Sequence, residues 1–180
     1  MSYEEVQSLA QKIIESESTK IYDLDILDIE NFCPRYGVLN QSERTQFFSH
    51  LMAVMSQLES CNKTETIFVE NNGNKSTGLM QISFRSISEK YKQNGCTDVN
   101  STEDLKDPDK NLKCGLAIMT SLVRDYGAIA KTAHQGASAY WSTLRKPYKV
   151  YIKSIDKTVR LGKQDEVIKL LKEKISICFE

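Results

Sequence analysis

Apolar residues recur at the spacing of an α-helix over residues 43–59. At roughly 100° per residue, six bulky apolar side chains of this stretch fall within an arc of about 120°. They are Phe47, Phe48, Leu51, Val54, Met55 and Leu58. Glu59 lies about 20° beyond the edge of that arc, in the last predicted turn. The pattern therefore places a carboxylate at the border of an apolar core.

Further helices are predicted from apolar spacing and from start and stop signals. They cover residues 3–15, a brief segment at 84–91, a helix that begins at Asp107-Pro108 and ends near Gly127, and a short segment at 137–145. Residues 78–82 form a short apolar segment after a turn. Residues 146–174 hold many lysines that could meet an acidic polymer, but a charge-rich helix is usually a solvated face.

At 180 residues the chain is predicted to form one compact domain. We expect an N-terminal helical wrap over residues 1–41, a core over 42–150, and a C-terminal amphipathic helix over 151–180 that packs on the core. The fold class predicted from these elements is mainly α, with a short irregular β segment.

Charge and apolar runs exclude several classes of protein. The 24 basic residues are balanced by 24 acidic ones, so the electrostatic pattern of a nucleic-acid-binding protein is missing. The apolar runs are far shorter than the ~20 residues of a transmembrane helix, so no transmembrane segment is expected. The start of the sequence lacks the basic and apolar regions of a secretory signal. Either an export signal has been removed, or export follows another route.

The cysteines and histidines give no sign of a metal or cofactor site. Five cysteines occur without a Cys-x-x-Cys pair, and only His50 and His134 are present. No cofactor and no metal are therefore expected.

Short motifs follow one another in a specific order along the middle of the chain. They are Glu59-Ser60, the run Ser-Thr-Gly-Leu-Met-Gln-Ile at residues 76–82, Asp107-Pro108 with Asn111, and Ala139-Tyr140. This order resembles that of the lysozyme-like lytic transglycosylases, the soluble lytic transglycosylase catalytic domain, which is similar to goose-type lysozyme. The resemblance covers about residues 42–145. It implies an α+β lysozyme-like fold with a substrate cleft, peptidoglycan glycan strands as the partner, and an extracytoplasmic site of action.

Glu59 is the predicted catalytic residue, and its position supports this independently of the resemblance. Cleavage of a glycosidic bond needs a carboxylic acid that is still protonated near neutral pH. Apolar neighbours and the negative end of the helix dipole would both raise the pKa of Glu59. The alternative is a glutamate that merely faces solvent at a helix end.

The resemblance assigns substrate-binding roles to a further set of residues: Ser60, Gly78, Leu79, Met80, Gln81, Tyr140 and Trp141. Gly78 would let the backbone pass close to the sugar, and Gln81 would contact the substrate beside the scissile bond. Leu79 and Met80 would line the cleft, although they fit an ordinary buried strand equally well. Trp141 stands where the family has Asn, a departure at this subsite.

The sequence is compatible with more than one reaction. A hydrolase commonly uses a second carboxylate, and the candidates Glu65, Glu70 and Asp98 have no spacing that fixes them opposite Glu59. We therefore favour a single-acid lytic transglycosylase that cleaves the MurNAc–GlcNAc β-1,4 bond and leaves 1,6-anhydro ends. A hydrolytic lysozyme, a Cys61/His134 peptidoglycan peptidase and an inactive glycan-binding module remain as alternatives.

Cysteine pairing follows from the expected site of action. An exported wall enzyme meets oxidising conditions, and Cys96 and Cys114 flank a polar loop between two helical segments, so we predict a disulfide between them. Cys33 and Cys61 form a weaker second pair, which leaves Cys178 free. In the competing reading Cys96 and Cys114 stay reduced. The sequence gives no oligomeric state.

Overall fold

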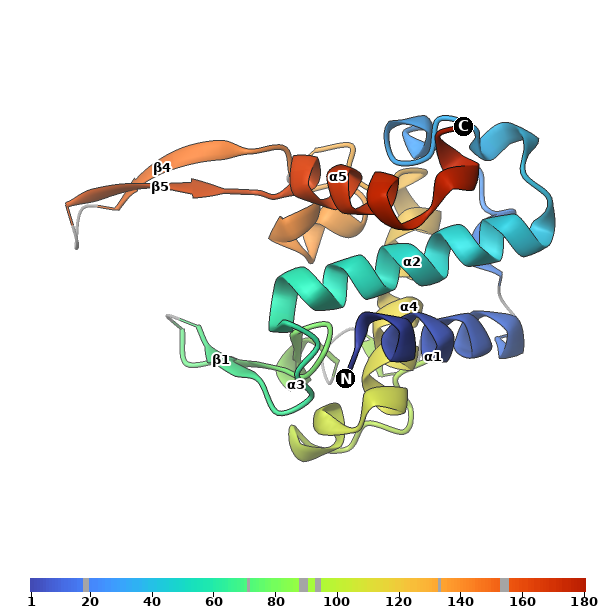
Figure 1. Ribbon diagram of the computed structural model, residues 1–180. Coiled ribbons are helices and arrows are strands. Elements are labelled where there is room, and N and C mark those ends of the chain that lie inside the picture. The colour runs from blue at the N-terminus through green and yellow to red at the C-terminus, as the bar shows by residue number, and fades with distance from the viewer. Residues whose placement is uncertain (18–19, 71, 88–90, 93–94, 133, 153–155) are drawn as a thin grey trace.

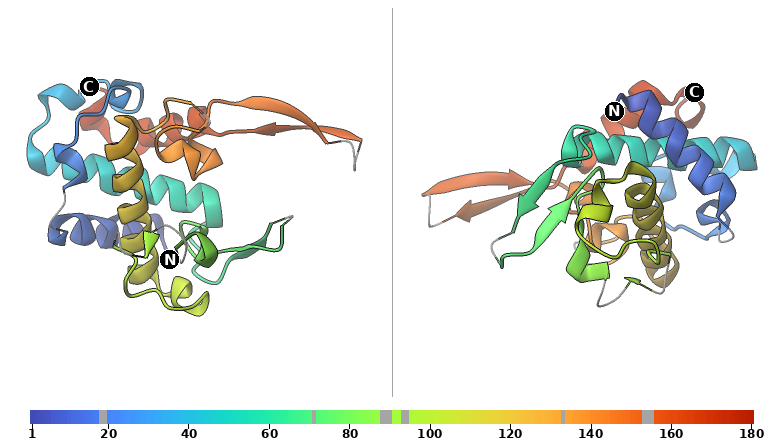
Figure 2. Two further views of the ribbon diagram at one scale, coloured as in Figure 1. Left: turned by 180° about the vertical axis from the view of Figure 1, so that it is seen from behind. Right: turned by 90° about the horizontal axis from the view of Figure 1, so that it is seen from below.

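The computed structural model describes residues 1–180 except 18–19, 71, 88–90, 93–94, 133 and 153–155. The protein is mainly helical and carries two small antiparallel sheets, which confirms the predicted α+β class (Figure 1). Both sheets project from the same side of the helical body in all three ribbon views (Figures 1 and 2).

Helix α2, Gln41–Ser60, runs through the middle of the fold and confirms the helix predicted over 43–59. It begins with a capping box, in which the Asn40 side chain accepts from the Glu43 N–H at 3.1 Å and the Glu43 carboxylate accepts from the Asn40 N–H at 2.8 Å. It ends at Cys61, whose φ of 54° is left-handed. Glu59 therefore lies in the last turn, as predicted.

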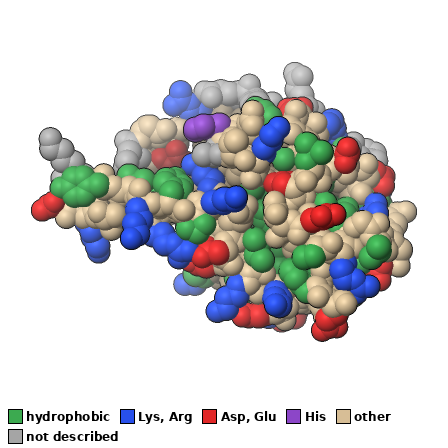
Figure 3. Space-filling view, turned by 90° about the horizontal axis from the view of Figure 1, so that it is seen from above, with side chains coloured by type: hydrophobic (Ala, Val, Ile, Leu, Met, Phe, Trp, Pro, Cys, Tyr) green, Lys and Arg blue, Asp and Glu red, His purple; other side chains and the backbone are tan. Residues whose placement is uncertain are grey.

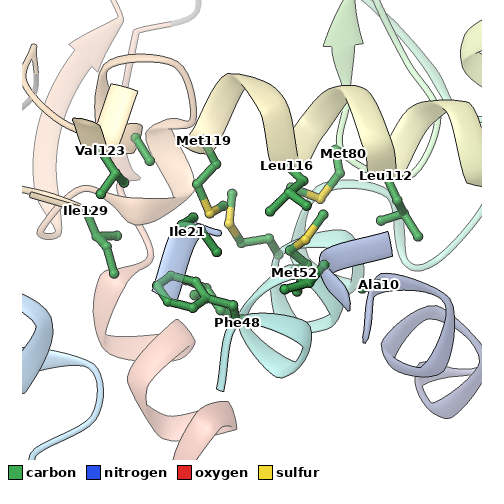
Figure 4. Close-up of a cluster of buried hydrophobic side chains, with 14 of the residues drawn as sticks. Ala10, Ile21, Phe48, Met52, Met80, Leu112, Leu116, Met119, Val123 and Ile129 are labelled. Atoms are coloured by element: carbon green, nitrogen blue, oxygen red, sulfur yellow. The ribbon is translucent and has the colours of Figure 1, made fainter. Parts of the chain in front are cut away.

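Two other helices enclose the core with α2. Helix α1, Tyr3–Ser16, packs along α2, and helix α4, Pro108–Tyr126, begins at its N-cap Asp107 with proline in the first turn. Figure 4 shows Phe48 and Met52 of α2 facing Leu116 and Met119 of α4. These four side chains are almost completely buried, so the core lies between the long helices.

The described part of the connection from α1 to α2 contains three short 3₁₀ turns and no regular helix: η1 Ile21–Asp23, η2 Ile29–Asn31 and η3 Tyr36–Val38. A disulfide joins Cys33 in this connection to Cys178, which belongs to the final turn η9, Ser176–Cys178. The predicted Cys33–Cys61 pair is therefore wrong. Cys61 is free and exposed, and Cys178 is held beside the N-terminal region by a contact that spans 145 residues.

The first sheet follows α2. Strand β1, Ile67–Val69, pairs antiparallel with β2, Lys75–Thr77, and β2 pairs with β3, Ile82–Ser83. The brief helix predicted at 84–91 is described only at its start, as α3, Phe84–Ser86, because residues 88–90 lie outside the described part of the chain. Beyond it, η5, Glu103–Lys106, leads to α4, and the predicted Cys96–Cys114 disulfide is present.

The C-terminal part differs most from prediction. Two 3₁₀ turns, η6 Ala137–Ala139 and η7 Ser142–Leu144, replace the single helix expected over 137–145. Strands β4, Tyr148–Ile152, and β5, Lys157–Leu161, then form a long hairpin before α5, Gln164–Lys174. The continuous helix expected over 151–180 is therefore wrong in its first part. Aromatic and β-branched residues alternate with charged ones there, which favours strands. The division of the chain at residues 41 and 150 stays a prediction.

None of the helices in the described ranges has both the length and the apolar character of a membrane-spanning segment.

Candidate active site

A cavity of about 700 Å³ opens where the end of α2 meets the first sheet and residues 139–142. Its wall combines a carboxylate from the helix, hydroxyl and apolar side chains from the sheet, and aromatic residues from the segment that follows η6. The lining residues are Glu59, Thr66, Ile67, Phe68, Glu70, Ser76, Gln81, Ser83, Ser86, Ala139, Tyr140, Trp141 and Ser142. The structure thus brings Glu59, Gln81, Tyr140 and Trp141 together.

Glu59 is partly buried in the wall of this cavity. The Thr143 hydroxyl donates a hydrogen bond to Oε1 of Glu59. Burial raises the pKa of Glu59, whereas the Thr143 hydrogen bond and the charge of Lys163 lower it, and the net direction is upward. A raised pKa keeps the carboxyl protonated at higher pH than usual, which suits a general acid.

Gln81 enters the cavity from an unusual backbone position. Its φ of 46° is left-handed, and its Nε2 donates to the carbonyl oxygens of Gly78 at 2.8 Å and Thr66 at 3.1 Å. Gly78 has a φ of 77°, and a Cβ there would lie 2.1 Å from the Leu105 carbonyl oxygen. Only glycine fits this close approach. Gly78 therefore shapes the turn that carries Gln81 and does not itself line the cavity.

Asn111 holds the same turn from the core side, although the sequence motif gave it no role. Its side chain is completely buried. Its Oδ1 accepts from the Met80 N–H at 2.9 Å, and its Nδ2 donates to the carbonyl oxygens of Leu105 at 2.8 Å and Thr77 at 3.0 Å. One amide side chain thus satisfies three backbone groups across the turn.

Besides Gly78, three more of the expected substrate contacts do not line the cavity. The side chains of Leu79 and Met80 are fully buried in the hydrophobic core. They are therefore buried apolar positions, as the alternative interpretation had it, and they do not line the cleft. Ser60 is also buried, and its hydroxyl donates back to the Ser56 carbonyl oxygen at 3.0 Å. The apolar pattern of residues 78–82 thus serves packing.

Tyr140 and Trp141 form the aromatic side of the cavity. The hydroxyl of Tyr140 accepts a hydrogen bond from the Ser83 N–H at 3.0 Å, and burial raises its pKa to about 12. The ring nitrogen of Trp141 donates to the Met80 carbonyl oxygen at 2.7 Å. Trp141 is only 2% exposed. Trp141 therefore anchors this segment to the turn below it, and Tyr140 stays neutral at physiological pH.

Of the three candidate second carboxylates, Glu70 alone lies in this cavity wall. Its Oε1 accepts from the Ser76 hydroxyl at 2.8 Å. Glu65 is exposed and pairs with Lys106 at 3.2 Å, and Asp98 pairs with Lys113 at 3.2 Å. Glu70 lies on the β1–β2 hairpin, so sequence spacing alone could not locate it relative to the end of α2.

The cysteine alternative gains no support from the geometry. Cys61 and His134 are both exposed, and no interaction joins them within the described part of the chain. Across the described ranges, His, Cys, Asp and Glu side chains also form no group of three or more that could hold a metal ion.

Residues 40–155 match the family described as the transglycosylase SLT domain. The chain belongs to this family. As an SLT transglycosylase it is a glycosidic bond-cleaving enzyme of the lytic transglycosylase type, and its substrate is peptidoglycan. The site of action is therefore extracytoplasmic, and two disulfides fit an oxidising compartment.

Solved structures similar to this SLT transglycosylase agree with the family. The wild-type form 2 of Bd0314 DslA is 28% identical, with a TM-score of 0.77, and the match covers 97% of this chain and 91% of that chain. Two mutants of Bd0314 DslA, each with one glutamate changed to glutamine, give TM-scores of 0.75 and 0.77. Both are also 28% identical, and each match covers 97% of this chain and 91% of that chain. No match is found among curated proteins.

Proposed function

We propose that this enzyme cleaves the MurNAc–GlcNAc β-1,4 bond of peptidoglycan with Glu59 as its single catalytic acid and leaves 1,6-anhydro ends. The observation that carries the proposal is the raised pKa of Glu59, a carboxyl partly buried in the wall of the cavity. A protonated carboxyl at this position can give its proton to the leaving oxygen near neutral pH.

The proton balance closes with Glu59 alone. Glu59 donates its proton to the glycosidic oxygen, and the bond to C1 of the muramyl residue breaks with oxocarbenium character. The resulting carboxylate accepts the proton of the muramyl 6-hydroxyl as that oxygen bonds to C1. The anhydro ring closes, and Glu59 is protonated again for the next cycle.

Polar groups of the cavity wall are available to hold the sugar. Both described hydrogen bonds of the Gln81 side chain use Nε2, which leaves the amide oxygen to meet a substrate donor. Ser83 is 5% exposed, and its Oγ has no hydrogen-bond partner among the described residues. Because buried hydroxyls are normally satisfied, we assign Ser83 a hydrogen bond to the bound sugar.

Substitution of Glu59 tests the assignment. Purified Glu59→Gln should fold normally and lose at least about 10²-fold in the rate of peptidoglycan clearing. The matched control is Glu30→Gln, which alters an exposed glutamate far from the cavity in sequence and should keep full activity. If Glu59→Gln clears peptidoglycan while Cys61→Ala does not, the cysteine peptidase is correct instead.

Hydrolysis is a second candidate, because Glu70 lies in the same cavity wall. A second carboxylate can activate water or stabilise the oxocarbenium state. The two glutamates exchanged in the mutants of Bd0314 DslA are eleven positions apart, as are Glu59 and Glu70. If Glu70 activates water, Glu70→Gln should abolish reducing-end products. In the single-acid reaction, Glu70→Gln should leave the chemical nature of the products unchanged.

A further inference from the structure

The β4–β5 hairpin and its flanks concentrate positive charge in a protein whose net charge is zero. Residues 145–163 contain seven Lys or Arg residues and a single Asp. We call this segment the basic arm. It projects away from the helical body (Figures 1 and 2), and a space-filling view shows basic side chains along one edge and hydrophobic ones along another (Figure 3).

The strand register places two cations side by side on the arm. Lys149 of β4 is directly opposite Arg160 of β5, with Tyr151 and Thr158 as the next pair on the same face. Like charges at directly opposed positions destabilise a hairpin unless an anion lies between them. Arg160 is paired with Asp165 and Glu166 at the start of α5. Lys149 has no carboxylate within ion-pair distance among the described residues.

This face is open to solvent. Lys149 and Thr158 are exposed, and Tyr151 is 59% exposed. Strands β4 and β5 contact each other extensively. Neither strand contacts any other described element to a comparable extent. A two-stranded hairpin gains little stability in water by itself. The cation pair therefore contributes nothing to the core. The carboxylates at the start of α5 balance Arg160 and leave the Lys149 ammonium without a counter-ion among the described residues.

The base of the arm is continuous with the active-site cavity. Trp141 and Ser142 line the cavity, and the arm leaves the body three residues later. Its return strand is fixed at the same place, because the Lys163 N–H donates to the Thr143 carbonyl oxygen at 3.1 Å and the Gln164 N–H donates to the Arg145 carbonyl oxygen at 3.0 Å. A polymer that leaves the cavity on this side therefore meets the arm.

We propose that the Lys149–Arg160 face of the basic arm binds the carboxylates of the peptide stems on the glycan strand outside the cavity. The proposal rests on peptidoglycan being the substrate. Its sugars are uncharged once the lactyl carboxyl of the muramyl residue is joined to a stem, whereas the stems carry free carboxylates. Charge complementarity therefore selects the stems rather than the sugar backbone.

A binding experiment with inactive protein separates this role from catalysis. In a Glu59→Gln background, Lys149→Glu is compared with Lys157→Glu, which makes the same charge change on the opposite face of the hairpin. The ligands are intact sacculi, sacculi whose stem carboxylates have been converted to amides with a carbodiimide and ammonia, and phosphatidylglycerol vesicles. Lys149→Glu should weaken binding to intact sacculi about threefold or more and Lys157→Glu clearly less, with no change on amidated sacculi. Thermal stability should not fall, because the new carboxylate would face Arg160.

Several outcomes would overturn the proposal. They are unchanged binding of Lys149→Glu to intact sacculi, an equal loss on amidated sacculi, and an equal loss for Lys157→Glu. Loss of vesicle binding with sacculus binding intact would assign the arm to anionic lipid instead. Failure of the unsubstituted chain to cleave peptidoglycan would refute the proposed reaction, and the binding comparison would still decide the role of the arm.

Discussion

The hydroxyl of Thr143 donates a hydrogen bond to Oε1 of Glu59, two residues that are 84 positions apart in the sequence. Thr143 lies in η7, immediately before the basic arm, and Glu59 lies in the last turn of α2. The bond fixes the carboxyl and opposes the effect of burial on its pKa. Thr143 is therefore a positioning residue for the proposed acid.

Thr143→Val tests this relationship through the pH dependence of activity. The Thr143 bond favours the charged carboxylate and lowers the pKa of Glu59, so its removal should raise that pKa further. Because the proposed reaction needs protonated Glu59, the alkaline limb of the pH–rate profile should move to higher pH. Thr143→Ser keeps the hydroxyl and should leave the limb in place. A shift to lower pH in Thr143→Val would contradict the assignment.

The same carboxyl should affect stability as a function of pH. A carboxyl whose pKa is raised on folding stabilises the folded state below its unfolded-state pKa, and this contribution is lost as pH rises through the folded-state pKa. Glu59→Gln should therefore melt at a higher temperature than wild type at neutral pH, with the gap closing below about pH 4. Thermal scans across this range, with Glu30→Gln as the reference, measure the gap. A gap that does not depend on pH would show that Glu59 is not perturbed.

Asn111→Ala should be strongly destabilising. It would leave the Met80 N–H and the Thr77 and Leu105 carbonyl groups without their buried partner, at a cost of about 3 kcal/mol or more. Activity of the folded fraction should also fall, since this turn carries Gln81. Urea unfolding measures the loss, and the exposed Asn31→Ala is the matched control. Equal stability of the two variants would be inconsistent with these contacts.

The two disulfides should differ in their contribution to stability. In the chain-entropy model, a cross-link over 145 residues is worth about 5 kcal/mol and one over 18 residues about 3 kcal/mol. Replacing both Cys33 and Cys178 by serine should therefore lower the free energy of unfolding more than replacing both Cys96 and Cys114 by serine. Guanidinium unfolding of the two double variants gives the comparison, and the reverse order would contradict the model.

The long helices α1, α2 and α4 and the position of Glu59 in the last turn of α2 could be predicted from sequence because their signals are local. The apolar arc of α2 fixed the position of Glu59, and Asp107-Pro108 marked the start of α4. The Cys96–Cys114 disulfide could also be predicted from the sequence, because only 18 positions separate the two cysteines. Motifs in their order then indicated the family.

Other features depend on contacts between distant parts of the chain. The Thr143–Glu59 bond and the Cys33–Cys178 disulfide join segments whose spacing carries no signal. Glu70 reaches the cavity only because a hairpin folds toward the end of α2. The sequence of the basic arm did contain a strand signal, because Lys149 alternates with the apolar or aromatic residues on either side of it at the start of β4. The many lysines of this segment instead led to the prediction of a solvated helix.

Mass analysis of the muropeptides released by the wild-type enzyme tests the proposed reaction most directly. A sugar end formed by ring closure is lighter by one water than a reducing end formed by hydrolysis. We predict 1,6-anhydro ends as the main product, with the same products from Glu70→Gln and none from Glu59→Gln. Reducing ends as the main product of the wild type, lost in Glu70→Gln, would contradict the single-acid account and assign the enzyme to hydrolysis.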